Sequence, residues 1–336
     1  MLSLPPEPDP AAAISVRGLR MYYRVHTRQP GLRGALLSFV HRHYQEVRAV
    51  HDVSFDIRPG ELVGFLGPNG AGKTTTLKVL TGLLHPTAGQ VRVLGYVPQR
   101  REPALQRQLA LVMGQKSQLW WDLPTLDSLL VFKEIYAVDD ASFRDRIAGL
   151  VELLDLGELL RVPVRKLSLG ERMKCELAVS LLHRPRVLLL DEPTIGLDVL
   201  MQKRVREFVR EYNRRHAATV LLTSHYMDDV KELCERVIVI NGGRLVYDGP
   251  LSAIIRRYAD HKLLGADFAA PVPVAALAEL GEVVSYQPER AVLRVPRDEV
   301  PARAAALLAR FPVADLSVQE AELEDVIRDM FQAERP

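Results

Sequence analysis

Cysteine is scarce in this chain of 336 residues, which contains only Cys175 and Cys234. The two lie far apart in the sequence and form no Cys-x-x-Cys pair. A disulfide framework needs several cysteines, and a cysteine zinc site needs closely spaced pairs. The shortage therefore excludes both kinds of site and is typical of a protein from a reducing compartment.

Long apolar runs are also missing. A membrane-spanning helix needs about 20 consecutive apolar residues, whereas the longest aliphatic stretches here are strand-sized, as in residues 187–190. Residues 1–13 are rich in proline and carry acids, a poor signal-peptide pattern that predicts a flexible leader. We therefore expect a cytoplasmic protein that reaches a membrane only through a partner.

Neither sign of charge dominates. The 44 Lys and Arg residues nearly balance the 42 Asp and Glu residues, which leaves a formal net charge of +2. Nucleic-acid-binding proteins usually carry a basic excess, so no nucleic-acid partner is expected. The hydrophobic fraction of 48% is normal for a globular protein, and the length predicts one large domain and one small one.

The sequence does contain a phosphate-binding loop. The segment GPNGAGKT fits the pattern G-x-x-x-x-G-K-[ST], between a short apolar strand (61–67) and a helix-like segment (74–84). Its glycines let backbone N–H groups turn toward phosphate oxygens, and the helix directs its positive end at the same anion. Lys73 should contact the β- and γ-phosphates and Thr74 should ligate Mg²⁺. The predicted ATP-binding residues of this segment are Gly67, Pro68, Asn69, Gly70, Ala71, Gly72, Lys73, Thr74 and Thr75.

Two adjacent carboxylates end a second apolar strand, residues 186–191. Asp191 is placed to hold Mg²⁺, directly or through water, and Glu192 to polarise the attacking water as a general base. A single Asp-Glu pair after a strand is common, but a phosphate loop in the same sheet makes a hydrolytic site the better interpretation.

The remaining pattern predicts the fold class. Apolar strands at 14–23, 49–57, 186–191, 219–225 and 236–245 alternate with helix-like segments, and residues 100–183 are mainly helical in periodicity. This alternation predicts an α/β core with a mostly parallel sheet. Residues 256–336 then follow the order βαββαβ with a terminal helix, which predicts a small ferredoxin-like α+β domain. The terminal helix carries an apolar stripe of Leu323, Val326, Ile327 and Met330.

A third segment, Leu167-Ser168-Leu169-Gly170-Glu171, stands before a helix with Met173, Leu177 and Leu181 on one face. Alone, Ser168 would be an N-cap. Together with the phosphate loop and the acidic strand, however, this segment resembles the signature loop of ATP-binding cassette (ABC) nucleotide-binding domains. The resemblance covers residues 14–250. It includes Gln115 as the Q-loop glutamine, residues 195–198 as the D-loop ending in Asp198, and His225 as the switch histidine.

The resemblance implies a role for each of these residues. Gln115 would coordinate Mg²⁺ and sense the γ-phosphate, and His225 would align the attacking water. Ser168 and Gly170 would cap the γ-phosphate held by a second nucleotide-binding domain, so hydrolysis would need two such domains head to tail. One chain holds a complete set, which makes a homodimer sufficient. Leu169 and Glu171 depart from the usual Leu-Ser-Gly-Gly-Gln wording, which puts nucleotide affinity and rate in doubt.

The residue that stacks on adenine is left open between two tyrosines. Tyr44 lies five residues before Ala49, the family's commonest spacing, and Tyr23 follows the first strand as family tyrosines also do. A basic insertion at 24–45 separates them, and we favour Tyr44.

Three features resemble the ATPases of type-2 exporters: a single nucleotide-binding domain (14–255) without membrane helices, the wording of residues 64–84, and the small C-terminal domain (256–336). The resemblance implies integral membrane permease subunits as partners and a location at the cytoplasmic face of the cell membrane. Trp120 and Trp121, and separately the insertion at 24–45, are candidate contacts for that partner. The alternative is a soluble ABC ATPase acting on a ribosome or nucleic-acid complex.

Overall fold

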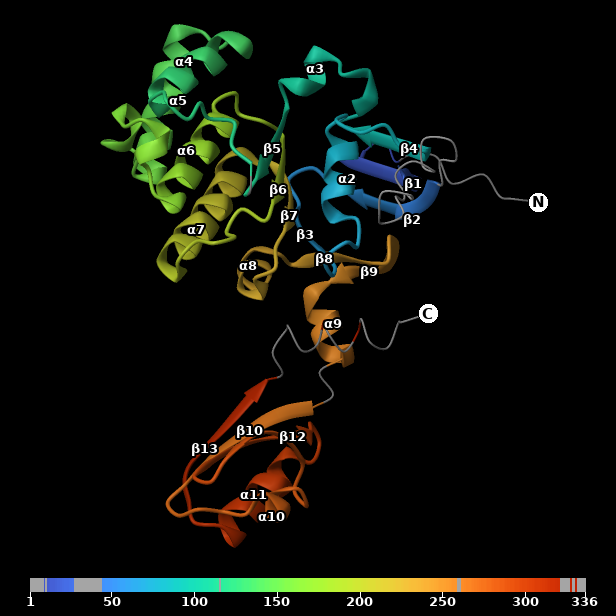
Figure 1. The fold of residues 1–336 in the computed structure, drawn as a ribbon, viewed down its shortest axis with the longest axis vertical. Coiled ribbons are helices and arrows are strands. Elements are labelled where there is room, and N and C mark those ends of the chain that lie inside the picture. The colour runs from blue at the N-terminus through green and yellow to red at the C-terminus, as the bar shows by residue number, and fades with distance from the viewer. Residues whose placement is uncertain are drawn as a thin grey trace, which may run out of the picture. The chain divides into compact units, whose positions relative to one another are not determined.

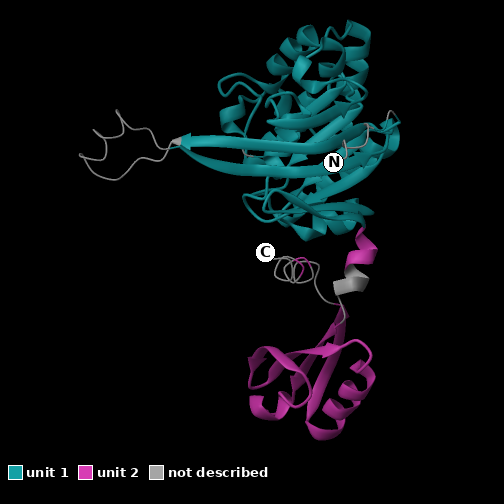
Figure 2. Cartoon of the chain, turned by 90° about the vertical axis from the view of Figure 1, so that its right-hand side faces the viewer, with its two compact units in different colours: residues 1–249 teal, residues 250–336 magenta. Residues whose placement is uncertain are grey.

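The computed structural model describes residues 9, 11–26, 44–114, 116–258, 261–320, 327 and 330. The chain divides into two compact units, residues 1–249 and 250–336 (Figure 2). This division falls six residues before the boundary expected from the sequence, because helix α9 (Leu251–Tyr258) belongs to the second unit.

A six-stranded sheet forms the centre of the first unit (Figure 1). Its order is β5-β6-β7-β3-β8-β9, and the four pairs β5·β6, β6·β7, β7·β3 and β3·β8 are parallel. The interior strands β6 and β7 are buried along their whole length, which explains their continuous apolar sequences. The strands are β3 (Leu62–Leu66), β5 (Leu109–Met113), β6 (Val187–Asp191), β7 (Thr219–Thr223), β8 (Arg236–Asn241) and β9 (Arg244–Pro250).

A second, antiparallel sheet has the order β2-β1-β4. Strands β1 (Ile14–His26) and β2 (Tyr44–Ile57) run side by side as two long antiparallel strands (Figure 2). Strand β4 (Ala88–Val93) pairs with the other edge of β1. Apolar side chains of this sheet share one core with β3 and helix α2 (Lys73–Leu80). The two sheets and α2 therefore hold the phosphate loop in a rigid setting.

Helices cover the rest of the first unit. Residues 100–183 were predicted to be mainly helical, and the structure corrects this at one place, where β5 lies at the edge of the central sheet. The predicted strand at 236–245 is likewise two strands, β8 and β9, separated by Gly242 and Gly243. The helices are α3 (Pro103–Gln106), α4 (Thr125–Ile135), α5 (Asp140–Leu154), α6 (Leu169–Leu181), α7 (Val199–His216) and α8 (Met227–Leu233), with single 3-10 turns η1 (Pro98–Arg100), η2 (Leu159–Arg161) and η3 (Val164–Lys166).

The second unit confirms the predicted βαββαβ order. Its four antiparallel strands are arranged β11-β12-β10-β13, the sheet order of a ferredoxin-like fold. The elements are β10 (His261–Phe268), α10 (Val274–Leu277), β11 (Glu282–Gln287), β12 (Arg290–Pro296), α11 (Val300–Arg310) and β13 (Val313–Glu320). In the expected terminal stripe, Ile327 and Met330 are buried, while Leu323 and Val326 lie outside the described residues. Most of the predicted leader and insertion also lies outside them.

Candidate functional site

The phosphate loop follows β3 and leads into α2, as the sequence predicted. Gly72 is the N-cap of α2 with φ of 102°, and a Cβ there would overlap the carbonyl oxygen of Ala49 on β2. Only glycine fits this combination of left-handed backbone and close approach. Gly70 also has a positive φ, and a Cβ there would meet open space.

Lys73 organises the loop from inside. Its Nζ donates hydrogen bonds to the carbonyl oxygens of Gly67 (2.6 Å) and Pro68 (3.2 Å), and its side chain is buried. Burial lowers the pKa of Lys73, and the nearby carboxylates of Glu192 and Asp191 oppose that shift. Thr74 and Thr75 are half-buried in the first turn of α2, which contains no acidic side chain. The positive end of α2 is therefore not neutralised locally and remains suited to phosphate.

Asp191 and Glu192 occupy the end of β6. Asp191 is 8% exposed, and the hydroxyl of Thr223 on β7 donates a 2.8 Å hydrogen bond to its Oδ1. Glu192 has φ of 54°, an unusual conformation for a non-glycine residue that costs about 1 kcal/mol or more. Thr223 stabilises this turn, because the N–H of Glu192 donates to its carbonyl oxygen at 3.0 Å.

The structure brings Glu192 and His225 together. His225 Nε2 lies 2.7 Å from Glu192 Oε1, and both side chains remain partly exposed at 37% and 18%. Two residues singled out from separate strand ends therefore form one contact, on the side of the sheet where the phosphate loop also begins.

A buried cluster behind this contact was not recognised from the sequence. Asp229, in α8, is 1% exposed and its Oδ2 accepts hydrogen bonds from the hydroxyls of Thr194 (2.5 Å) and Ser224 (2.6 Å). Arg206 of α7 donates to its Oδ1 at 3.0 Å. Thr194 follows Glu192 closely and Ser224 precedes His225, so Asp229 ties the two loops together. The available signal was an acid four residues after His225, at the start of a helix.

Gln115 itself lies outside the described residues, but both of its neighbours are anchored. The N–H of Gly114 donates to the carbonyl oxygen of Asp191 at 2.9 Å, and a Cβ at Gly114 would overlap the backbone of Glu192. Lys116 N–H donates to the carbonyl oxygen of Met113 at 3.0 Å. Position 115 therefore follows the end of β5 directly, and Gly114 ties that end to the end of β6.

The signature residues cap α6. Ser168 Oγ accepts from the N–H of Glu171 at 3.3 Å, and Glu171 Oε2 accepts from the N–H of Ser168 at 2.8 Å, which completes a capping box. This hydrogen bond lowers the pKa of Glu171. Glutamate can therefore stand at position 171 in place of the family's glutamine, because its ionised carboxylate accepts the hydrogen bond of the capping box.

The D-loop lies against the signature segment. Gly196 approaches the side chain of Leu169, and Gly170 approaches Met201 of α7. Asp198 is the N-cap of α7 and accepts from the N–H of Met201 at 2.8 Å. Ser168 and Asp198 are both exposed, so these two predicted residues face outward from the chain that carries them.

The two candidate tyrosines lie at different distances from the phosphate loop. Tyr23 pairs with Val47, two residues from Ala49, and its side chain packs on the core cluster that contains Ala71. Tyr44 pairs with His26 and is 57% exposed. At about 3.3 Å per residue, Tyr44 lies roughly 16 Å along β2 from Ala49.

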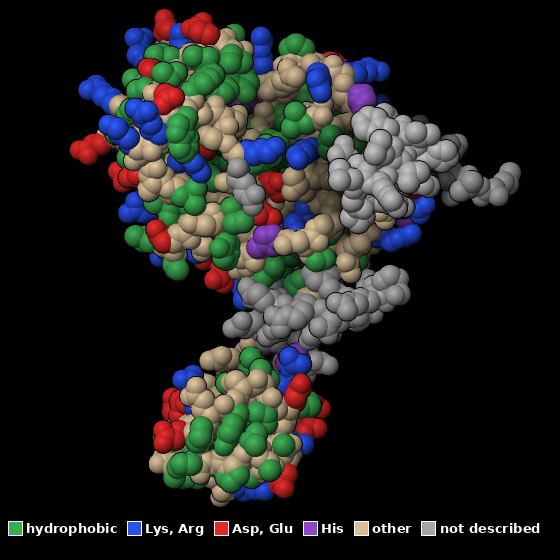
Figure 3. Space-filling view, in the orientation of Figure 1, with side chains coloured by type: hydrophobic (Ala, Val, Ile, Leu, Met, Phe, Trp, Pro, Cys, Tyr) green, Lys and Arg blue, Asp and Glu red, His purple; other side chains and the backbone are tan. Residues whose placement is uncertain are grey.

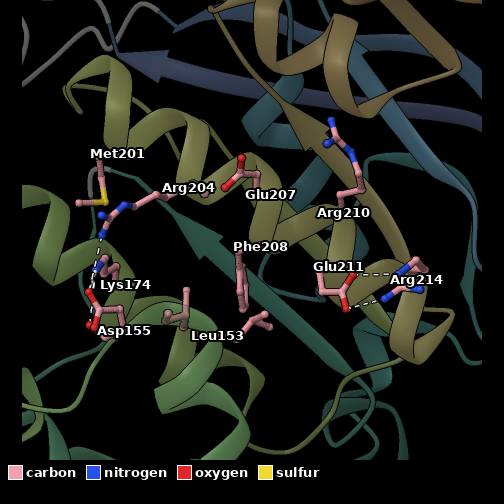
Figure 4. Close-up of a pocket in the computed structure, with 12 residues that line it drawn as sticks. Leu153, Asp155, Lys174, Met201, Arg204, Glu207, Phe208, Arg210, Glu211 and Arg214 are labelled. Atoms are coloured by element: carbon pink, nitrogen blue, oxygen red, sulfur yellow. Dashed lines mark hydrogen bonds and ion pairs between the residues drawn. The ribbon is translucent and has the colours of Figure 1, made fainter.

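A cavity of about 610 Å³ lies between α5, α6 and α7 (Figure 4). None of the predicted nucleotide-site residues lines it. Most of its charged side chains pair with one another: Lys174 and Arg204 with Asp155, and Arg214 with Glu211. Glu207 and Arg210 pair with Lys203 and Glu232, which lie outside the lining. These pairs leave little uncompensated charge for a ligand. Among the described residues, no group of three or more His, Cys, Asp or Glu side chains could hold a metal ion, and no helix is long and apolar enough to span a membrane.

Comparison with known proteins agrees with this geometry. Residues 50–195 match the family described as ABC transporter, and residues 260–319 match the family described as EvrA-like ABC transporter, C-terminal domain. The ABC transporter ATP-binding protein NatA of Bacillus subtilis is 34% identical over 208 residues, which cover 62% of this chain and 84% of NatA. Nod factor export ATP-binding protein I of Paraburkholderia xenovorans is 37% identical over 246 residues, covering 73% and 79% of the two chains. Linearmycin resistance ATP-binding protein LnrL of Bacillus subtilis is 30% identical over 251 residues, covering 73% and 80%.

Solved structures extend the likeness to the fold. The ATP-binding subunit of an ABC transporter has a TM-score of 0.61 and 26% identity, covering 73% of this chain and 93% of the other. A dimeric ATP-binding cassette in a post-hydrolysis state with ADP and Pi has a TM-score of 0.58 at 22% identity, covering 71% and 98%, and supports the fold alone. The expected fold class is therefore confirmed, and this chain belongs to the ATP-hydrolysing, ATP-binding subunits of ABC transporters.

Proposed function

We propose that this chain hydrolyses Mg²⁺–ATP to drive export of a substrate through a separate membrane subunit. The observation that carries the proposal is the 2.7 Å contact between His225 and Glu192 beside the Lys73 loop. In this mechanism Lys73 and the N-terminus of α2 bind the β- and γ-phosphates. Glu192 orients and deprotonates the attacking water, and His225 fixes the position of Glu192 relative to the γ-phosphate.

Mg²⁺ fits the residues present. Thr74 supplies a hydroxyl at the start of α2, Asp191 supplies a carboxylate whose orientation is fixed by Thr223, and Gln115 would add an amide oxygen. Two or three protein oxygens are what Mg²⁺ needs when phosphates and waters complete its shell. When bound, the ion neutralises charge on the phosphates, while the protein residues position the nucleotide and the water.

The capped end of α6 supports a composite site. Ser168 is exposed at a helix N-terminus, the kind of site that binds anions, and Asp198 is exposed beside it. We propose that Ser168 and Gly170 contact the γ-phosphate held by a second copy of this chain, with Asp198 at the same interface. Residues for both halves are present in one chain, so a homodimer is the simplest assembly.

An apolar surface supports docking of the membrane subunit. Large apolar side chains are exposed around α4 and the segment before it, and Figure 3 shows apolar side chains gathered over this region. They are Trp120, Trp121, Leu123, Leu130, Val131 and Ile135. A groove of about 470 Å³ runs beside them, lined in part by Leu83, Ser117 and Tyr136. Exposed aromatic clusters of this kind are favoured interface anchors. The insertion at 24–45 stays a second proposed contact, with residues 27–43 outside the described part.

The relatives favour export over the alternative function. One relative is named for export of Nod factor and another for linearmycin resistance. Neither name refers to a ribosome or to nucleic acid. We propose a peripheral position at the cytoplasmic face of the membrane. The test is to co-express the chain with candidate membrane subunits, purify any complex and measure its ATPase activity in lipid vesicles. Mg²⁺-dependent ATPase stimulated by that partner is expected, and Trp120→Ala with Trp121→Ala should abolish complex recovery. Hydrolysis that ignores every membrane partner and rises instead with ribosomes or DNA would overturn the proposal.

A further inference from the structure

Residues 117–119 are held by a buried carboxylate from another element. Glu176 lies in α6 and is 3% exposed. Its Oε1 accepts hydrogen bonds from the N–H groups of Gln118 (2.9 Å) and Leu119 (3.4 Å), and also from the hydroxyl of Ser117. Its Oε2 accepts from Gln118 N–H at 3.1 Å. One side chain of α6 therefore binds three consecutive residues.

Two further residues of α6 contact the same segment. The guanidinium of Arg172 lies over the ring of Trp121, 5.7 Å from its centroid. Ser180 Oγ accepts a 2.9 Å hydrogen bond from Gln118 Nε2, which also donates to the carbonyl oxygen of Leu111 on β5. Arg172, Glu176 and Ser180 are spaced four residues apart, so they form one stripe along α6. We call these three residues the α6 stripe.

The use of a carboxylate here is costly. Among the described residues, the direct partners of Glu176 are neutral donors, and burial raises the pKa of its carboxyl group. A buried charge whose hydrogen-bond donors are all neutral is destabilising compared with a neutral side chain that fills the same space, and the charge of Arg172 opposes the effect of burial only in part. Its specific advantage is that a carboxylate accepts several strong hydrogen bonds at once, so it fixes the backbone of residues 117–119 tightly.

The stripe connects two parts of the proposed ATPase cycle. The segment that it holds begins just after Gln115 and ends at Trp120 and Trp121, on the surface proposed to meet the membrane subunit. Helix α6 begins at Ser168, about 12 Å from Glu176 at 1.5 Å per residue. A helix is stiff over that length, so a displacement of residues 117–121 would be passed to the signature end.

We propose that Glu176 is a positioning residue that couples residues 117–121 to the signature end of α6. Nucleotide contact at Ser168 would then change the conformation of the segment that carries Trp120 and Trp121, and contact at these tryptophans would change the position of Ser168. The proposal rests on the proposed function, which assigns nucleotide contact to Ser168 and membrane-subunit contact to Trp120 and Trp121. The coupling itself is a property of this chain and is measurable without a membrane partner.

The chain provides its own probe, because its two tryptophans are Trp120 and Trp121. Intrinsic fluorescence of the full-length chain therefore reports on the segment held by the α6 stripe. We would titrate Mg²⁺ and a non-hydrolysable ATP analogue into wild type and variants, and measure analogue affinity separately by calorimetry. A change in tryptophan emission on saturation is expected for wild type.

Glu176→Ala should uncouple the two signals. Its fluorescence change should fall by about 5-fold or more while the analogue Kd stays within about 3-fold, because the lost hydrogen bonds act on the segment and not on the phosphates. In ATPase assays kcat should fall by about 10-fold with KM nearly unchanged. Glu176→Gln keeps one acceptor oxygen and should restore part of the fluorescence change. Gln118 and Leu119 amides should exchange with solvent faster in Glu176→Ala.

A matched control lies on the same helix. Lys174 is also buried but pairs with Asp155 on the other side, so Lys174→Gln should keep the full fluorescence change. The proposal is overturned if saturating nucleotide leaves wild-type emission unchanged, if Glu176→Ala keeps the wild-type response, or if Lys174→Gln loses it equally. If the wild-type chain does not hydrolyse ATP, that result counts against the proposed function. The fluorescence test can still be interpreted, because it uses a non-hydrolysable analogue.

Discussion

The imidazole of His225 lies 2.7 Å from the carboxylate of Glu192, because the two residues follow neighbouring parallel strands, β7 and β6. Thr223 stabilises this arrangement on one side, since its hydroxyl binds Asp191 and its carbonyl oxygen accepts the N–H of Glu192. Asp229 stabilises it on the other through Thr194 and Ser224. The proposed general base is therefore fixed by protein contacts from both strands, which is what electrostatic preorganisation requires.

Glu192→Gln should separate binding from hydrolysis. Glutamine has the same shape and keeps a hydrogen-bonding partner for His225, but it does not accept a proton from water. We expect kcat to fall by about 100-fold to 10,000-fold, the usual contribution of a general base. ATP affinity should stay within about 3-fold, because the change acts on the transition state. Steady-state ATPase assays and nucleotide titration would measure the two effects.

The same variant should accumulate an ATP-bound dimer, visible by light scattering after gel filtration. Glu207→Gln is a suitable control, since Glu207 lies in α7 and lines the cavity between α5, α6 and α7. Wild-type turnover in Glu192→Gln would refute the assignment of the base.

Lys73→Ala should weaken nucleotide binding. The ammonium group donates hydrogen bonds to the carbonyl oxygens of Gly67 and Pro68, and it would bind phosphate oxygens of the nucleotide. Loss of charge-assisted hydrogen bonds worth about 1.5–3 kcal/mol corresponds to a Kd increase of about 10-fold to 150-fold. Fluorescent-nucleotide titration measures this. Lys78→Ala, on the same helix, should bind like wild type, and equal weakening in both variants would point to loss of α2 instead.

Sequence patterns predicted the fold where apolar burial is continuous. β6 and β7 are fully buried, and their unbroken aliphatic runs predicted strands correctly. β5 was missed because its five apolar residues lie within a long helix-like stretch, and a short apolar run fits either structure. β4 was missed because only Val91 and Val93 are buried, so no clear alternation marks it.

The candidate site was predictable as far as its motifs are linear. The phosphate loop, Asp191, Glu192 and His225 each stand at a strand end, and parallel strands bring those ends to one edge of the sheet. The parts that were not predicted depend on tertiary contacts. Asp229 and Glu176 contact residues of other elements, and nothing in their local sequence states which backbone groups they would meet.

We propose Tyr23 as the adenine-stacking residue, although spacing along the sequence favours Tyr44. It lies opposite Val47, two residues from Ala49, whereas Tyr44 lies five residues from Ala49 along β2. Ala49 is the β2 residue whose carbonyl oxygen lies against Gly72 of the loop. Tyr23→Ala should raise the Kd for ATP by about 5-fold to 150-fold, since stacking one base is worth about 1–3 kcal/mol. Tyr23→Phe should preserve affinity. A loss of affinity in Tyr44→Ala but not in Tyr23→Ala would restore the first interpretation.

His183 should make stability depend on pH. It follows α6, stacks on Tyr136 at 3.8 Å between ring centroids, and lies 3.2 Å from the carbonyl oxygen of Leu109 through Nε2. A carbonyl oxygen only accepts, so Nε2 carries the proton in the neutral ring. Nδ1 is buried without a hydrogen-bond partner among the described residues. Burial, with a smaller contribution from Arg146, lowers the pKa of His183 to about 4 from the usual 6.5.

Because the folded-state pKa is depressed, the unfolded chain takes up a proton at His183 before the folded one does. The stabilisation is complete above pH 6.5 and is lost as pH falls toward 4. At 1.36 kcal/mol per pH unit the loss is about 3 kcal/mol.

Denaturant unfolding at pH 7 and pH 5 should show this slope in wild type. His183→Gln keeps an N–H donor but does not titrate, so its slope should be shallower by about one proton. Parallel slopes in wild type and His183→Gln would mean that another group is responsible for the acid sensitivity.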